Sequence, residues 1–69
     1  MKLSARNVLK GTVESVTHGA VNSEVTLTLP GGAKVVSIIT KESAENLGLK
    51  RGKEAYAVIK ASNVMIAID

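Results

Sequence analysis

Polar and apolar residues alternate along the first half of the chain. The alternation is most regular over residues 20–29, and residues 3–17 show it less regularly. A period of two is typical of antiparallel strands that bury one face. Gly11 lies within the first of these segments, and a glycine inside a strand suggests a bulge or a tight bend. The pattern therefore predicts two long strands joined by a turn at Thr17-His18-Gly19.

The next segment, residues 33–40, follows a turn at Pro30-Gly31-Gly32 and has apolar residues on both faces. One face carries Val35 and Ile39, and the other carries Val36 and Ile38. Two interpretations are open. The second face lies in an interface between subunits, or the strand is central in the sheet and is covered by the helix that follows.

The second half of the chain predicts one short helix and two more strands. Residues 41–47 form the helix, with Thr40 as its N-cap and Gly48 directly after its end. Strands are predicted at residues 53–61 and 63–68. The resulting order is that of an all-β, OB-like five-stranded Greek-key barrel with one short helix between strands 3 and 4. An SH3-like barrel, the main competing architecture, normally lacks a helix at that position.

Composition limits what such a barrel can do. The chain has 69 residues, so residues 1–69 are expected to form a single domain. It contains no Cys, Phe or Trp, and Tyr56 is its one aromatic residue. A hydrophobic content of 45% in so small a body suggests an oligomer. No apolar run approaches the roughly 20 residues of a membrane span, and the N-terminus is not a signal peptide, so a cytoplasmic protein is expected.

A net charge of +3 suits an anionic ligand, and two groups near the ends of the chain could bind one. Ser4 and Arg6, two residues apart, would share one face of the first strand and combine a hydroxyl with a planar, charged guanidinium. Lys60 ends an apolar run near the C-terminus. It either extends into solvent or turns inward, where it would need an anion.

A third group lies at the predicted helix start, where Thr40 and Ser43 add hydroxyls to unpaired backbone N–H groups. An ordinary helix cap is the simpler interpretation of this pair. Catalysis is not expected, because His18 is the sole imidazole and no serine has a matching histidine and carboxylate. A metal-cation site is not expected either, since the acidic residues are scattered along the chain.

Taken together, these groups match the motifs of one family. The matching segments are Ser4-Ala5-Arg6-Asn7 with Gly11 after it, Thr40 with Ser43, His18-Gly19-Ala20-Val21-Asn22, and Lys60-Ala61-Ser62 followed by Val64-Met65-Ile66-Ala67. The chain resembles the molbindins, small molybdate-binding proteins built from a single Mop domain, over essentially its whole length, and no departure from the motifs is visible.

The resemblance implies a homo-hexamer arranged as a trimer of dimers, which binds molybdate or tungstate between subunits for storage, buffering or homeostasis. It implies no organic cofactor. Ser4, Ala5 and Arg6 would come from one subunit, and Thr40, Ser43, Lys60, Ala61 and Ser62 from the facing part of the assembly. Sites near the threefold axis are also implied, and His18, Gly19 and Ala20 are candidates for them.

The chemistry of molybdate agrees with these residues. Molybdate is a tetrahedral dianion without a proton at neutral pH, so a site for it needs hydrogen-bond donors and positive charge. Sulfate would be distinguished by cavity size, and phosphate by the absence of a carboxylate acceptor. Two alternatives remain. One is a nucleic-acid-binding OB fold, for which Tyr56 alone offers base stacking. The other is a purely structural subunit.

Overall fold

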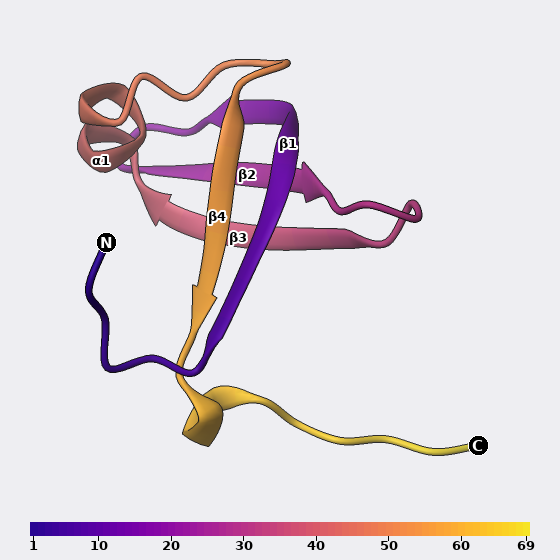
Figure 1. Ribbon diagram of the computed structural model, residues 1–69. Helices are drawn as coiled ribbons and strands as arrows, with labels where there is room; N and C mark the ends of the chain where they lie inside the picture. The colour runs from indigo at the N-terminus through magenta and orange to yellow at the C-terminus, as the bar shows by residue number, and fades with distance from the viewer.

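The computed structural model describes all residues from 1 to 69, and they form one antiparallel sheet with a short helix (Figure 1). The sheet has the order β3-β2-β1-β4 and curls around a small core. The elements are β1 (Asn7–His18), β2 (Asn22–Thr28), β3 (Lys34–Thr40), α1 (Lys41–Asn46), β4 (Glu54–Ile59) and the 3₁₀ turn η1 (Ala61–Asn63). The predicted all-β, OB-like class with one helix between strands 3 and 4 is confirmed. No helix has the length and apolarity needed to cross a membrane.

The core lies on the concave face of the curled sheet and is small. Val13 from β1 and Val25 and Leu27 from β2 are fully buried at its centre. Partly buried apolar side chains surround them, namely Val16, Ile39, Leu49, Ala55 and Ala57. Burying one such aliphatic side chain contributes about 1.5–3 kcal/mol, so three of them together offset only a small part of the conformational entropy, about 1–2 kcal/mol per residue, that the chain loses on folding.

β1 is long because it pairs with a different neighbour along each of its halves. Residues 7–12 pair with β4, and residues 12–18 pair with β2. The register shifts between Val13 and Ser15, and Figure 1 shows β1 turning sharply along its length. The predicted irregularity is therefore present, but it lies past Gly11. A Cβ at Gly11 would sit 2.8 Å from the Thr28 carbonyl oxygen, so glycine is required there by close packing against β2.

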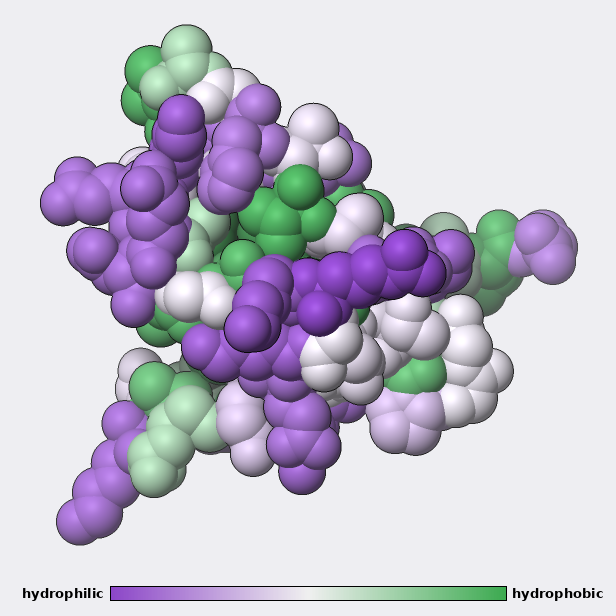
Figure 2. All heavy atoms as spheres, turned by 90° about the horizontal axis from the view of Figure 1, so that it is seen from above, coloured by the Kyte–Doolittle hydropathy of each residue, from purple (hydrophilic) through white to green (hydrophobic).

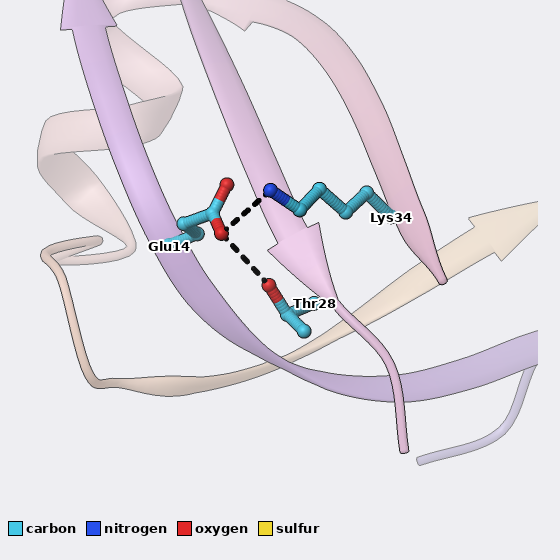
Figure 3. A network of polar contacts seen from close by, with 3 residues as sticks. All are labelled: Glu14, Thr28 and Lys34. Carbon is cyan, nitrogen blue, oxygen red and sulfur yellow. Dashed lines mark hydrogen bonds and ion pairs between the residues drawn. The ribbon is translucent and has the colours of Figure 1, made fainter. Parts of the chain in front are cut away.

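On the sheet face away from the core, one polar network joins three strands (Figure 3). The Lys34 ammonium on β3 lies 2.9 Å from Glu14 Oε1 on β1. Thr28 at the end of β2 donates its hydroxyl to the same carboxylate oxygen at 3.4 Å. The hydrogen bond from Lys34 is the main reason why the pKa of Glu14 is lowered from its ordinary value of 4.5. The Glu14 carboxylate therefore binds side chains of the two neighbouring strands β2 and β3.

The helix begins as predicted, and its N-cap is formed by Thr40. The Thr40 hydroxyl oxygen accepts a hydrogen bond from the Ser43 backbone N–H at 3.0 Å. Ala44 is the residue of α1 that is buried. The helix ends at Asn46, and Gly48 then adopts a φ of +62°, which glycine tolerates at a helix end.

The predicted fifth strand, residues 63–68, is wrong for the single chain. After the η1 turn the chain runs on without a sheet partner, and its large apolar side chains are exposed. Alternating polarity favours a strand only if another strand edge lies alongside it. In one copy of this chain no strand takes that place.

The position of β3 in the sheet excludes one of the two interpretations of its apolar faces. It is an edge strand rather than a central one. Val36 and Ile38 on its second face are 60% and 61% exposed, so α1 does not cover them. The interpretation as a covered central strand is wrong, and the interpretation as a subunit interface stays a prediction.

Candidate functional site

Two of the three predicted groups lie together at one end of the sheet. Asn7 pairs with Ile59 where β1 begins and β4 ends, and the Asn7 side-chain amide donates to the Ile59 carbonyl oxygen at 3.2 Å. This pairing places Ser4-Ala5-Arg6, which precedes β1, beside Lys60-Ala61-Ser62, which follows β4 (Figure 1). We call these six residues the terminal cluster. Its two halves are far apart in the sequence, and the β1–β4 ladder joins them.

The prediction that Ser4 and Arg6 share a strand face is wrong, since the strand begins at Asn7. Both residues lie in bends of an irregular segment. A strand needs a partner, and the β4 side of the ladder ends at Ile59, opposite Asn7. The Ser4 and Arg6 side chains are therefore positioned by the bends and not by a two-residue repeat.

The terminal cluster has positive charge without a nearby acidic partner in the sequence. Residues 1–13 and 55–68 contain no Asp or Glu. The ion pairs of the structure join Lys10 to Glu54 and Lys34 to Glu14, and Arg6 and Lys60 take part in neither. Both are exposed, so Lys60 extends into solvent in the single chain. Cations left unpaired at one place are available to an anion.

Sequence reasoning did not include Asn7 and Lys2 among the site residues. Asn7 joins the two halves of the terminal cluster through its side-chain amide, so it acts as a positioning residue. Its place in the Ser-Ala-Arg-Asn motif was the available signal. Lys2 adds a further exposed cation to the N-terminal segment. Its signal was the absence of acidic residues near it in the sequence.

Thr40 and Ser43 lie at the opposite end of β1 from the terminal cluster. Thr40 pairs with Asn22 at the start of β2, whose neighbour Ser23 pairs with His18 at the far end of β1. The Thr40 hydroxyl also donates to Ser43 Oγ at 2.8 Å, so the two hydroxyls bond to each other. Within one chain this pair is an ordinary helix cap and does not reach Arg6 or Lys60 (Figure 1).

The second-site candidates lie at the Thr40 end as well. His18 Nδ1 is 2.6 Å from Ser23 Oγ, which is 1% exposed, and Gly19 N–H donates to the Asn22 carbonyl oxygen at 2.7 Å. Ala20 borders a shallow hollow of about 420 Å³ that Glu42 and Glu45 also line. Lys41 lines the hollow too, but two carboxylates against one ammonium leave a net negative charge that opposes anion binding there in the single chain.

Comparison with known proteins identifies the relatives of this fold. The TOBE domain model matches residues 3–66. The molybdenum-pterin-binding protein 3 of Clostridium pasteurianum is 54% identical over 66 residues, which cover 96% of this chain and 97% of that protein. Both matches extend over nearly the whole chain, so they concern the complete fold and not one motif.

Two solved structures agree with that match. MopII from Clostridium pasteurianum superimposes with a TM-score of 0.91 at 48% identity, over 97% of this chain and 100% of that one. The cytoplasmic molybdate-binding protein ModG, with molybdate bound, gives a TM-score of 0.91 at 58% identity. That match covers 94% of this chain and 46% of ModG. With whole-chain identity near 50% and this fold, the chain belongs to the TOBE-domain family and, within it, to the single-Mop-domain molbindins.

Proposed function

We propose that this protein binds molybdate, and tungstate in the same way, at a site that includes Ser4, Arg6, Lys60 and Ser62. The observation that carries the proposal is the terminal cluster itself. The β1–β4 ladder brings two cations and two hydroxyls together, and the flanking sequences contain no carboxylate. Relatives named for molybdenum, and one whose structure holds molybdate, support this choice of anion.

The donor set fits a fully deprotonated tetrahedral dianion. Arg6 offers a planar fork of N–H donors, Lys60 a compact charge, and the serines O–H groups that rotate to suit the oxygens. Charge-assisted hydrogen bonds of this kind are about twice as strong as neutral ones. A protonated phosphate would need an acceptor in addition. For these reasons molybdate and tungstate are preferred over phosphate.

A second copy of the chain completes the site in this proposal. Arg6 and Lys60 are exposed in the single chain, and Thr40 and Ser43 lie at the other end of β1. Only a neighbouring copy can bring its Thr40 and Ser43 to the terminal cluster and exclude water from it. The exposed Val36 and Ile38 on edge strand β3 supply apolar surface for such an assembly. We take the assembly to be a homo-hexamer built as a trimer of dimers.

The role that follows is storage or buffering of the oxyanion in the cytoplasm by one domain of residues 1–69, without catalysis. Nucleic-acid binding is disfavoured because Tyr56 is the one aromatic residue that could stack on a base. The same argument applies to a pterin, which the names of the relatives mention. A pterin ring needs a stacking surface, and the terminal cluster contains no aromatic residue.

Titration calorimetry at physiological salt tests the proposal, with molybdate, tungstate, sulfate and phosphate in turn. Molybdate and tungstate are expected to bind tightly, sulfate weakly and phosphate more weakly still. Equal affinity for all four anions would reduce the terminal cluster to a nonspecific basic patch. Native mass spectrometry with and without molybdate then gives the oligomeric state and the number of anions together.

A further inference from the structure

Within one chain, the two halves of the terminal cluster are joined at a single place. Residues 1–6 lie outside every helix and strand, and they take part in no hydrogen bond of a turn, a loop or a side chain. Asn7 is therefore the first residue of the chain that is bonded to another segment.

Asn7 contacts Ile59 through both its backbone and its side chain. The two residues are the last pair of the β1–β4 ladder, and Asn7 Nδ2 donates to the Ile59 carbonyl oxygen at 3.2 Å. End pairs of a ladder open most readily, so a side-chain bond has its largest effect there. Arg6 directly precedes Asn7, and Lys60 directly follows Ile59. The Asn7–Ile59 pair therefore sets the separation between the two backbones that carry these cations.

The C-terminal half of the terminal cluster is also held by the η1 turn. Asn63 N–H donates to the Lys60 carbonyl oxygen at 2.8 Å. Residues 64–69, beyond the turn, are exposed, and they extend from the body of the molecule as an arm (Figure 1, Figure 2). In one chain the turn thus fixes Lys60 and Ser62 relative to β4. The N-terminal half has no such turn and is tied to β4 through Asn7.

The two serines of the terminal cluster follow the backbone more closely than the two cations do. Arginine and lysine side chains are long and can adapt to ions of different radius by changing rotamer. A serine hydroxyl lies one carbon from the backbone and cannot adapt in this way. Ser4 lies three residues before Asn7, and Ser62 lies three residues after Ile59. The span between the serine hydroxyls therefore changes when the Asn7–Ile59 pair loosens.

Molybdate and sulfate present the same hydrogen-bond acceptors to such a site. Both are tetrahedral dianions at neutral pH, and molybdate is the larger because its metal–oxygen bonds are longer. A site that holds its donors at a fixed span cannot close around the smaller ion, so donors stay unpaired when sulfate binds. A site whose two halves move freely can contract and accept both ions. Selectivity therefore depends on how firmly the two halves are held apart.

We propose that Asn7 sets the selectivity of the terminal cluster for molybdate over sulfate. This inference rests on the proposed function and adds to it a positioning residue whose amide nitrogen is bonded to Ile59. An amide suits the role because it donates a hydrogen bond without adding charge beside the cations. An aspartate of the same shape has no hydrogen to donate, and its carboxylate would pair with the cations.

Titration calorimetry with molybdate, followed by competition with sulfate, measures both affinities for the unchanged protein and for Asn7→Ala. Loss of the hydrogen bond is expected to lower the ratio of the molybdate affinity to the sulfate affinity about three- to tenfold. Asn7→Gln keeps a donor on a longer side chain and is expected to keep more of this ratio. Asn46→Ala, which removes an exposed amide from α1, is the control and should leave the ratio unchanged.

A second control separates selectivity from a general loss of stability. Val16→Ala removes apolar atoms that pack against the core on the β1–β2 side of the fold, away from the terminal cluster. It should lower the melting temperature at least as much as Asn7→Ala does, while leaving the ratio of the two affinities unchanged. If both variants lower the ratio equally, Asn7 acts only through the stability of the fold, and the inference is overturned.

The remaining outcomes distinguish failure of this inference from failure of the proposed function. If the unchanged protein does not prefer molybdate to sulfate, the proposed function fails and the inference fails with it. If the unchanged protein has this preference and Asn7→Ala keeps it in full, the inference alone is overturned. A lowered ratio in Asn7→Ala that Asn7→Gln partly restores, with both controls unchanged, supports it. Asn7→Ser, whose side chain is shorter than the amide, gives the same comparison if Asn7→Ala does not fold.

Discussion

Arg6 is the residue whose replacement tests the anion site most sharply. Its guanidinium is exposed and forms no ion pair or hydrogen bond within the chain. Replacing it therefore breaks no contact of the single chain, and the stability of the fold should change by no more than about 0.5 kcal/mol. Any large effect must come from what Arg6 binds. Few positions of this small protein separate ligand binding from folding so cleanly.

Two substitutions at this position divide charge from geometry. Arg6→Lys keeps the positive charge and loses the planar fork of donors. A hydrogen bond to a charged group contributes about 1.5–3 kcal/mol, so the loss of one weakens molybdate binding roughly ten- to a hundredfold. Arg6→Ala also removes the charge, and it is expected to weaken binding further. The proposed assembly, without ligand, should keep its stability or gain slightly, because Arg6 and Lys60 repel each other when no anion lies between them.

The assay pairs titration calorimetry with sedimentation, so that affinity and assembly are read on the same samples. Arg51→Lys and Arg51→Ala are the matched controls, because Arg51 is an exposed arginine outside the terminal cluster. They should bind molybdate as the unchanged protein does. Unchanged affinity in both Arg6 variants would make Arg6 an ordinary solvated side chain and refute the reasoning. Loss of the oligomer in both variants would make its role structural.

Three further predictions concern the fold and the assembly. Pairing with Lys34 lowers the pKa of Glu14 in the folded state below its value in the unfolded state. Glu14 therefore stabilises the fold at pH values above the unfolded-state pKa, and this stabilisation is lost as the pH falls through the folded-state pKa. Urea unfolding between about pH 3 and pH 6 should thus show a weaker pH dependence for Glu14→Gln than for the control Glu24→Gln. Gly11→Ala forces a Cβ to within 2.8 Å of the Thr28 carbonyl oxygen. Thermal unfolding should show the fold destabilised by about 1–3 kcal/mol. Gly19→Ala, whose Cβ would lie 3.0 Å from the Asn22 carbonyl oxygen in a turn, is the control and should destabilise the fold less. Val36→Lys should lower the oligomer mass measured by light scattering, whereas Thr12→Lys, at an exposed position of β1 that is not adjacent to β3, is the control. An unchanged mass for Val36→Lys would place the interface elsewhere.

Local patterns were sufficient for most of the fold. The alternation over residues 20–29 predicted β2 because its two strand neighbours lie in the same chain. Thr40 was predicted as an N-cap because a cap depends on residues only three positions away. The turn at Gly31 and Gly32 was also predicted from local residue types, and both glycines adopt positive φ. Signals of this kind need no knowledge of distant segments.

Patterns that depend on a distant partner were less reliable. Residues 63–68 alternate as a strand does, but alternation cannot tell whether the partner edge belongs to the same chain. The prediction that Ser4 and Arg6 share a face assumed that both lie in the first strand. That strand begins only at Asn7, where β4 provides a partner. For the site, the sequence indicated donor groups that stay a prediction. It could not indicate that Lys60 lies with Arg6 and apart from Thr40, because the β1–β4 ladder decides that.

The position of η1 connects the anion site to the assembly. Lys60 begins the η1 turn that follows β4 and Ser62 lies within it, so this one short turn holds two donors of the proposed site. Binding an anion at the same turn offsets the repulsion between Arg6 and Lys60. If the site is complete only between copies, the anion binds the assembled state alone. At a concentration a hundred times its dissociation constant it then stabilises the assembly by about 2.7 kcal/mol per site. Anion binding and the proposed assembly are therefore expected to strengthen each other.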